Sequence, residues 1–322
     1  MPRNFKTKLI MQIANPIYDT VFKYMMNDSK VAKLLLSTII GEKIIDLELT
    51  SKDYYWNPEA DKEKRDKTLE YLTVCYLDFN AKIETETGEF KTVIIELQKA
   101  KIGTDIMRFR RYLGAVYLSP ENTYDEERQK ARQIYCIYFL NYEIGLPDSP
   151  VVKIDYQVRD LTTGVAVEKN SEFIKSLNHL SWIVQVKYLK EKRRNELEIL
   201  LSVFDQDNIT ENKHVLKIDE KAYPEKYRII IRKLIEAYAS QDVRDAMQVE
   251  DDYLSELLKL QKDIVKKEEV ISQKDEELAQ QDEVIAKQET ELAQKDEELA
   301  QKDEENTQLK EQIAELKRLL GE

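Results

Sequence analysis

Glycine is scarce in this chain. Only seven occur among 322 residues, at positions 41, 88, 103, 114, 145, 164 and 321. No two follow a G-x-G spacing, and none begins a G-K-S or G-K-T triplet. Because dinucleotide and P-loop sites need such glycines to let phosphate approach the backbone, we do not expect either kind of nucleotide site.

Histidine, cysteine and long apolar runs are also rare. His179 and His214 are the only histidines, so chemistry that rests on histidine, such as a His-ligated zinc site or a Ser-His-Asp triad, is poorly supplied. Cys75 and Cys136 lie in apolar stretches without a C-x-x-C pair, which indicates buried thiols in a reducing compartment. Since no run of about 18 apolar residues and no signal-peptide pattern occurs, we expect a cytoplasmic protein without a membrane span.

The net charge of −12 comes almost entirely from the end of the chain. Residues 251–322 contain 22 acidic and 11 basic residues, which leaves 40 acidic and 39 basic residues at positions 1–250. The first 250 residues are therefore nearly neutral and can still hold a basic groove. Net charge neither supports nor excludes DNA as a partner.

Residues 257–320 repeat with a period of seven. The first position of the heptad, a, is apolar with one exception: Leu257, Ile264, Ile271, Leu278, Ile285, Leu292, Leu299, Asn306, Ile313 and Leu320. Position d is apolar only at the two ends: Leu260, Lys267, Lys274, Gln281, Gln288, Lys295, Lys302, Leu309 and Leu316. This pattern predicts a long helix in a coiled coil that is weak in its middle.

The same repeat predicts a homo-oligomer. Asn306 at an a position is the kind of polar residue that fixes register at some cost in stability. A solvated single helix is the alternative, and the pattern leaves strand number and polarity open.

Capping residues and β-branched runs delimit the elements of the first 250 residues. A helix is predicted from Asn15-Pro16 through Met26, and a second from Asp28-Ser29 to Gly41. The other predicted elements are strands at 43–50, 72–83, 90–97, 133–142, 151–158 and 179–188, helices at 104–118, 193–204 and 223–239, and a charged loop at 57–67. Helices first, then strands with an interposed helix, indicate an α/β fold with a mixed sheet.

Residues 72–97 are predicted to form a hairpin that carries chemistry. Gly88 suits the left-handed end of a three-residue loop, Glu86-Thr87-Gly88. That loop sets the sum of paired residue numbers at 174, so Asp78 falls opposite Glu96 on one sheet face. Two adjacent carboxylates repel unless a divalent cation binds them, and Mg²⁺ prefers such oxygen ligands. A solvated sheet face is the alternative environment for these acids.

Four motifs occur in order along the chain. They are Asp19-x-x-Phe22-Lys23, Asp78-Phe79 with Gly88-Glu89, Val93-Ile94-Ile95-Glu96-Leu97-Gln98, and Arg108-x-x-x-Tyr112. Together they resemble the PD-(D/E)XK nuclease superfamily, most closely its recombination-promoting nuclease or putative transposase branch, whose last motif is E-x-Q. The resemblance covers about residues 13–120. It implies a restriction-endonuclease-like core and a metal-dependent DNA endonuclease acting in recombination or transposition.

The resemblance also implies residue roles. Asp78 and Glu96 would hold one or two Mg²⁺ or Mn²⁺ ions, with Asp19 as a further ligand. Gln98, which replaces the usual lysine, would orient the attacking water, and Lys82 or Lys23 would supply the missing charge. The basic residues expected to contact DNA phosphates are Lys99, Lys101, Arg108, Arg110 and Arg111. Tyr112 is expected to pack in the core.

Three parts are predicted: a nuclease-like domain at 1–215, a helical connector at 216–250 and a coiled coil at 251–322. A catalytically inactive DNA-binding module is one alternative function, motivated by the missing lysine. A protein whose coiled coil is the functional part is another.

Overall fold

The computed structural model describes residues 10–49, 79–101, 105–119, 131–168, 171–190 and 193–320. The chain divides into two units, Met1–Glu256 and Leu257–Glu322. The first unit contains the sheet and all but one of the described helices, and the last helix passes from the first unit into the second.

A six-stranded mixed sheet lies at the centre of the first unit. Its strands are ordered β2 (Ile44–Leu49), β3 (Phe79–Thr85), β4 (Phe90–Gln98), β5 (Gln133–Leu140), β9 (Leu180–Gln185) and β6 (Val151–Ile154). The first three are antiparallel, β4, β5 and β9 are parallel, and β6 is antiparallel to β9. This arrangement confirms the predicted α/β fold with a mixed sheet.

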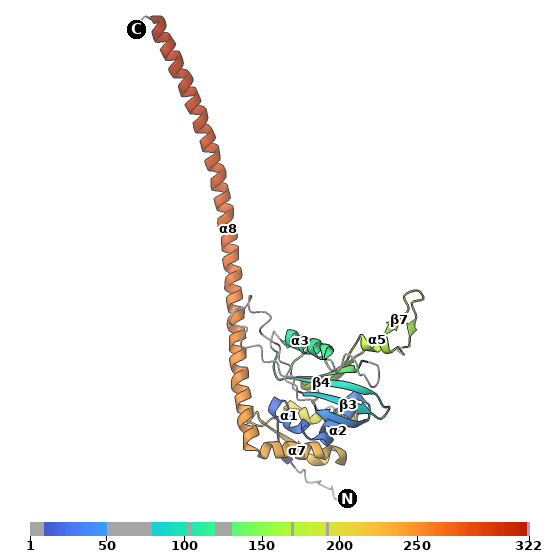
Figure 1. The fold of residues 1–322 in the computed structure, drawn as a ribbon. Coiled ribbons are helices and arrows are strands. Elements are labelled where there is room, and N and C mark those ends of the chain that lie inside the picture. The colour runs from blue at the N-terminus through green and yellow to red at the C-terminus, as the bar shows by residue number, and fades with distance from the viewer. Residues whose placement is uncertain are drawn as a thin grey trace, which may run out of the picture. The chain divides into compact units, whose positions relative to one another are not determined.

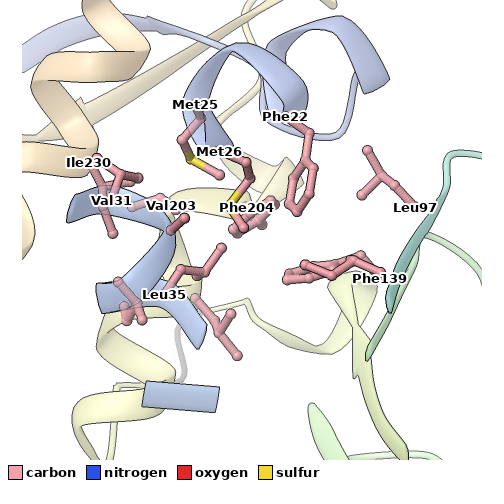
Figure 2. Packing of buried hydrophobic residues seen from close by; sticks show 14 of the residues in the cluster. Phe22, Met25, Met26, Val31, Leu35, Leu97, Phe139, Val203, Phe204 and Ile230 are labelled. Atoms are coloured by element: carbon pink, nitrogen blue, oxygen red, sulfur yellow. The ribbon is translucent and has the colours of Figure 1, made fainter. Parts of the chain in front are cut away.

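Helices cover the two faces of the sheet unequally (Figure 1). The large core includes residues of α1 (Asp19–Met26), α2 (Ser29–Ile40), α6 (Glu196–Leu201) and α7 (Arg228–Ala239). Figure 2 shows Phe22 of α1 facing Leu97 and Phe139 of the sheet, and the rings of Phe22 and Phe139 lie 5.5 Å apart. On the other face, α3 (Asp105–Leu118) covers a smaller core around Ile94 and Cys136.

Two short two-stranded sheets flank the main sheet. In one, β1 (Ile10–Ala14) pairs antiparallel with β10 (Val215–Asp219), which lies two hundred residues away in the sequence. Neither strand was predicted. In the other, β7 (Val158–Arg159) pairs with β8 (Ala166–Val167), and α5 (Glu172–Ser176) follows. Because β10 and α7 join the first unit, the predicted connector at 216–250 is not a separate part.

The second helix has the ends that its sequence predicts. Asp28 accepts hydrogen bonds from the backbone N–H groups of Lys30 and Val31, and Gly41 ends the helix with a φ of 80°. The predicted start of the first helix at Asn15-Pro16 is wrong, since α1 begins at Asp19. The Asn15 side chain instead accepts from the Ile17 N–H and donates to Gln206 and to the Lys213 carbonyl.

Other predicted boundaries move by a few residues. The strand predicted at 151–158 ends at Ile154, and the one predicted to reach residue 188 ends at Gln185 in a 3₁₀ turn. Short 3₁₀ segments also end the helix predicted at 193–204 and precede α7. The loop at 57–67 and residues 72–78 of the predicted first hairpin strand lie outside the described residues.

The final helix, α8, runs from Gln241 to Leu320 without a break. At 1.5 Å per residue its 80 residues span roughly 120 Å. It confirms the predicted long helix. None of the described helices combines the length and the apolar character needed to cross a membrane.

Candidate functional site

The hairpin of β3 and β4 has the predicted register. All six pairs, from Phe79 with Ile95 to Glu84 with Phe90, keep the sum of 174. The Thr85 N–H donates to the Glu89 carbonyl at 2.9 Å, and Gly88 has a φ of 76°. The three-residue loop is therefore confirmed. Asp78 lies outside the described residues, so its position opposite Glu96 stays a prediction.

Glu96 and Gln98 lie together near the carboxyl end of β4. Their exposed fractions are 2% and 5%, and the Gln98 side-chain amide donates a hydrogen bond to the Glu96 carboxylate. Both belong to the sheet face that Ile94 presents to α3, while Leu97 points into the larger core. A carboxylate and an amide are thus buried side by side at the end of β4.

An aromatic pair, Tyr138 and Phe109, lies on the side of Glu96 toward β5. Tyr138 lies beside Glu96 in the parallel register of β4 and β5, and the ring of Phe109 lies 4.4 Å from that of Tyr138. Burial raises the pKa of Tyr138, and the charges of Cys136 and Glu96 raise it further. Because Tyr138 stays protonated, Glu96 has a neutral neighbour in surroundings of low polarity, where charge interactions are strong.

The structure does not bring Asp19 beside Glu96. Asp19 forms a 2.6 Å ion pair with Lys23 one helical turn away, and its Oδ1 atom is buried without a hydrogen-bond partner in the described part of the chain. Helix α1 packs on the Leu97 face of β4, whereas Glu96 points to the opposite face. The predicted role of Asp19 as a further metal ligand therefore gains no support.

Lys82 is also removed from Glu96. It lies opposite Thr92, four residues before Glu96 along β4 and roughly 13 Å away at the rise of a strand. Although the two residues share a sheet face as predicted, Lys82 is too distant along the strand to stand in for a lysine at position 98.

Lys99 belongs to a polar network that the sequence did not reveal. Its ammonium group pairs with Asp251 and lies 3.4 Å from the centre of the Tyr18 ring. Asp251 also accepts a 3.0 Å hydrogen bond from the Tyr18 hydroxyl and lies 2.9 Å from His214 Nε2. Lys99 thus contacts Tyr18 of the body and Asp251 of α8 in this structure, and its contact with DNA phosphate stays a prediction. The sequence does not reveal this network because Asp251 lies 152 residues from Lys99 along the chain.

Glu250 connects α8 to the start of α1. Its carboxylate accepts hydrogen bonds from the backbone N–H groups of Asp19 at 3.0 Å and Thr20 at 2.7 Å. These N–H groups have no partner within α1, so Glu250 serves as a cap supplied by another helix. Burial raises the pKa of Glu250, and the nearby charge of Asp19 acts in the same direction.

The predicted DNA-contacting cluster is partly exposed. Lys101, Arg110 and Arg111 are exposed to solvent, which suits contacts with phosphate, whereas the side chain of Arg108 lies outside the described residues. Tyr112 is buried on α3, as expected for a packing residue.

The described donors suit a hard cation but do not complete a metal site. In the parts of the chain that the structure describes, no group of three or more His, Cys, Asp or Glu residues is placed to hold a metal. Glu96 and Gln98 supply carboxylate and amide oxygens, the ligands that Mg²⁺ prefers. The second carboxylate of the predicted site would come from Asp78.

Comparison with known proteins adds no relative. No family model, no curated protein and no solved structure matches this chain.

Proposed function

We propose that this protein is a Mg²⁺- or Mn²⁺-dependent DNA endonuclease that hydrolyses phosphodiester bonds. The observation that supports this most is the buried Glu96–Gln98 pair near the carboxyl end of β4. It lies in a hairpin whose register is the one for which Asp78 is predicted opposite Glu96. Burying a carboxylate costs free energy that hydrogen bonds only partly offset, so a buried Glu–Gln pair is an unusual choice for packing alone.

Each residue has a defined part in the proposed chemistry. Asp78 and Glu96 would hold the metal, which would lower the pKa of a bound water and stabilise charge on the leaving oxygen. Gln98 holds the Glu96 carboxylate through its amide N–H groups, and its carbonyl oxygen can orient a water. Glu96 is almost fully buried, so few waters other than metal-bound ones would reach it.

The basic surface supports DNA as the substrate. Lys101, Arg110 and Arg111 are exposed on or just before α3, the helix that covers the face of the sheet to which Glu96 belongs. Such side chains position a phosphate backbone without reading its sequence. A role in recombination or transposition and a cytoplasmic location are part of the same proposal. So is self-association through α8, whose apolar heptad positions are exposed in the single chain.

Plasmid cleavage tests the chemistry. We expect purified protein to nick supercoiled DNA with Mg²⁺ or Mn²⁺ and not with EDTA. Glu96→Gln and Asp78→Asn should each lower the rate by at least about a hundredfold, since each removes a charge from the metal site. Glu84→Gln is the matched control, because Glu84 lies in the same hairpin but opposite Phe90, away from Glu96.

Direct metal binding separates the remaining outcomes. Titration calorimetry with Mn²⁺ should detect binding to the wild-type chain and to Glu84→Gln, and weaker binding to Glu96→Gln. Binding of DNA without metal binding or cutting would favour an inactive DNA-binding module. Absence of all three in a folded protein would contradict the nuclease proposal and favour the alternative in which α8 carries the function.

A further inference from the structure

An apolar stripe on α8 carries one exposed apolar residue in each heptad. Six consecutive a positions of the second unit have exposed fractions of 51–60% in the single chain: Ile264, Ile271, Leu278, Ile285, Leu292 and Leu299. Apolar residues that recur every seven positions on one helix are the pattern of a coiled-coil seam. A partner helix with the same spacing would cover it, and the chain itself supplies such a helix.

Charged residues flank the stripe in a fixed order. Each of the six polar d positions is followed directly by an acidic e residue: Lys267-Glu268, Lys274-Asp275, Gln281-Asp282, Gln288-Glu289, Lys295-Asp296 and Lys302-Asp303. Within the described residues, the one ion pair of the second unit joins Lys287 to Glu283, both outside the a and d positions. The d-position lysines form no ion pair in the single chain.

We infer that α8 forms a parallel, in-register, two-stranded coiled coil with a second copy of this chain. In a parallel pair each a residue meets the a residue of the partner, and each d residue packs against the partner's d and e residues. Each apolar a residue then meets an apolar a residue of the other helix, the polar d residues form the layers between them, and each d lysine lies next to an acid of the other helix. This inference rests on the self-association proposed above and is independent of the chemistry at Glu96.

An antiparallel pair would not use the same pattern. There each a residue faces a d residue of the partner, so that leucine and isoleucine would meet lysine or glutamine over six heptads. The separation of apolar residues at a from polar residues at d therefore favours the parallel arrangement.

Asn306 supports a single register. In the in-register dimer it faces Asn306 of the other copy, and the two amides can hydrogen-bond. A slip by one heptad would place each Asn306 against Leu299 or Ile313 and leave its amide without a partner. Since the AQKDEEL-like repeats themselves allow such a slip, Asn306 is the residue that selects one register.

Disulfide trapping in the full-length protein tests orientation. The background is Cys75→Ser, with Cys136 retained because burial raises its pKa to about 12 and keeps the thiol unreactive. Ile264→Cys and Ile313→Cys, about 74 Å apart along the helix, should each form disulfide-linked dimers on their own. Cross-linking only when the two variants are mixed would show an antiparallel pair and overturn the inference.

Neighbouring lysines test the charge pattern. Lys267→Glu at a d position should weaken dimerisation about tenfold in sedimentation equilibrium, and adding Glu268→Lys should restore it. Lys266→Glu, one residue earlier at an exposed c position, is the matched control and should have little effect. Equal effects of the two single variants would contradict the d-to-e pairing. A monomeric wild type would refute self-association itself, and a trimer would refute the two-stranded form.

Discussion

Buried charge in this molecule is balanced by residues far away in the sequence. Asp251 receives a hydrogen bond from Tyr18, 233 positions earlier, and an ion pair from Lys99, 152 positions earlier. Lys91, fully buried on β4, pairs with Glu42 and Glu89. Because an unpaired buried charge costs several kcal/mol, these contacts constrain which segments can lie together.

Replacing Asp251 by Asn should destabilise the first unit by about 2 kcal/mol, because the charged hydrogen bonds from Lys99, His214 and Tyr18 are weakened. Burial raises the pKa of Asp251, but hydrogen bonds from Lys99 and His214 outweigh it and leave the pKa below its usual value. A carboxylate with a lowered pKa stabilises the fold above the unfolded pKa near 4 and loses that effect as pH falls through the folded pKa.

The measurement is urea denaturation of both proteins between pH 3 and pH 7. The difference in free energy of unfolding should be full above about pH 5 and shrink toward pH 3. Asp252→Asn is the control, since Asp252 is exposed and, among the described residues, accepts its side-chain hydrogen bond from Gln248 one turn earlier. A difference that is constant across this pH range would show that Asp251 does not act through its charge.

At the scale of elements, the sequence predicts well those features that depend on residues close together in the chain. The hairpin register follows from the loop Glu86-Thr87-Gly88, and the ends of α2 follow from Asp28 and Gly41. The start of α1 was missed because Glu250, which caps it, lies more than two hundred residues later in the chain. The pairing of β1 with β10 was missed for the same reason, since β10 lies at 215–219. Glu96 and Gln98 share a sheet face because side chains alternate along a strand, which is local, whereas the contacts of Lys99 depend on the distant Asp251.

The conformation of Gly88 in the hairpin loop can be tested by comparing it with Gly114, a glycine within α3. An added Cβ meets no atom within 4 Å at either position, so packing does not distinguish them. Gly88→Ala should destabilise the protein by about 1 kcal/mol, because its φ of 76° disfavours alanine. Gly114→Ala lies within α3 and should stabilise it by about 0.5–1 kcal/mol. Thermal melting measures both, and a shift of the same sign in the two variants would contradict the conformational argument.

At the scale of the whole molecule, α8 has two roles within one helix. Its first turns belong to the body, where Val243 and Met247 are buried in the large core and Glu250 and Asp251 bind α1 and Lys99. From Leu257 onward the helix exposes its apolar stripe to solvent. The boundary between body and tail therefore lies inside α8, at the point where the helix stops contacting the body. No loop or change in secondary structure marks it.

Two truncations separated by seven residues test where the body ends. A chain ending at Glu256 keeps every described contact of Glu250 and Asp251, so its thermal unfolding should match that of the body in the full-length protein. A chain ending at Val249 loses the cap of α1 and leaves Lys99 half-buried without its carboxylate partner. Loss of the partly buried ion pair should cost about 2 kcal/mol and loss of the cap about 1 kcal/mol, so this shorter chain should melt several degrees lower. If the two chains melt together, the turns of α8 beyond Val249 do not contribute to the stability of the body.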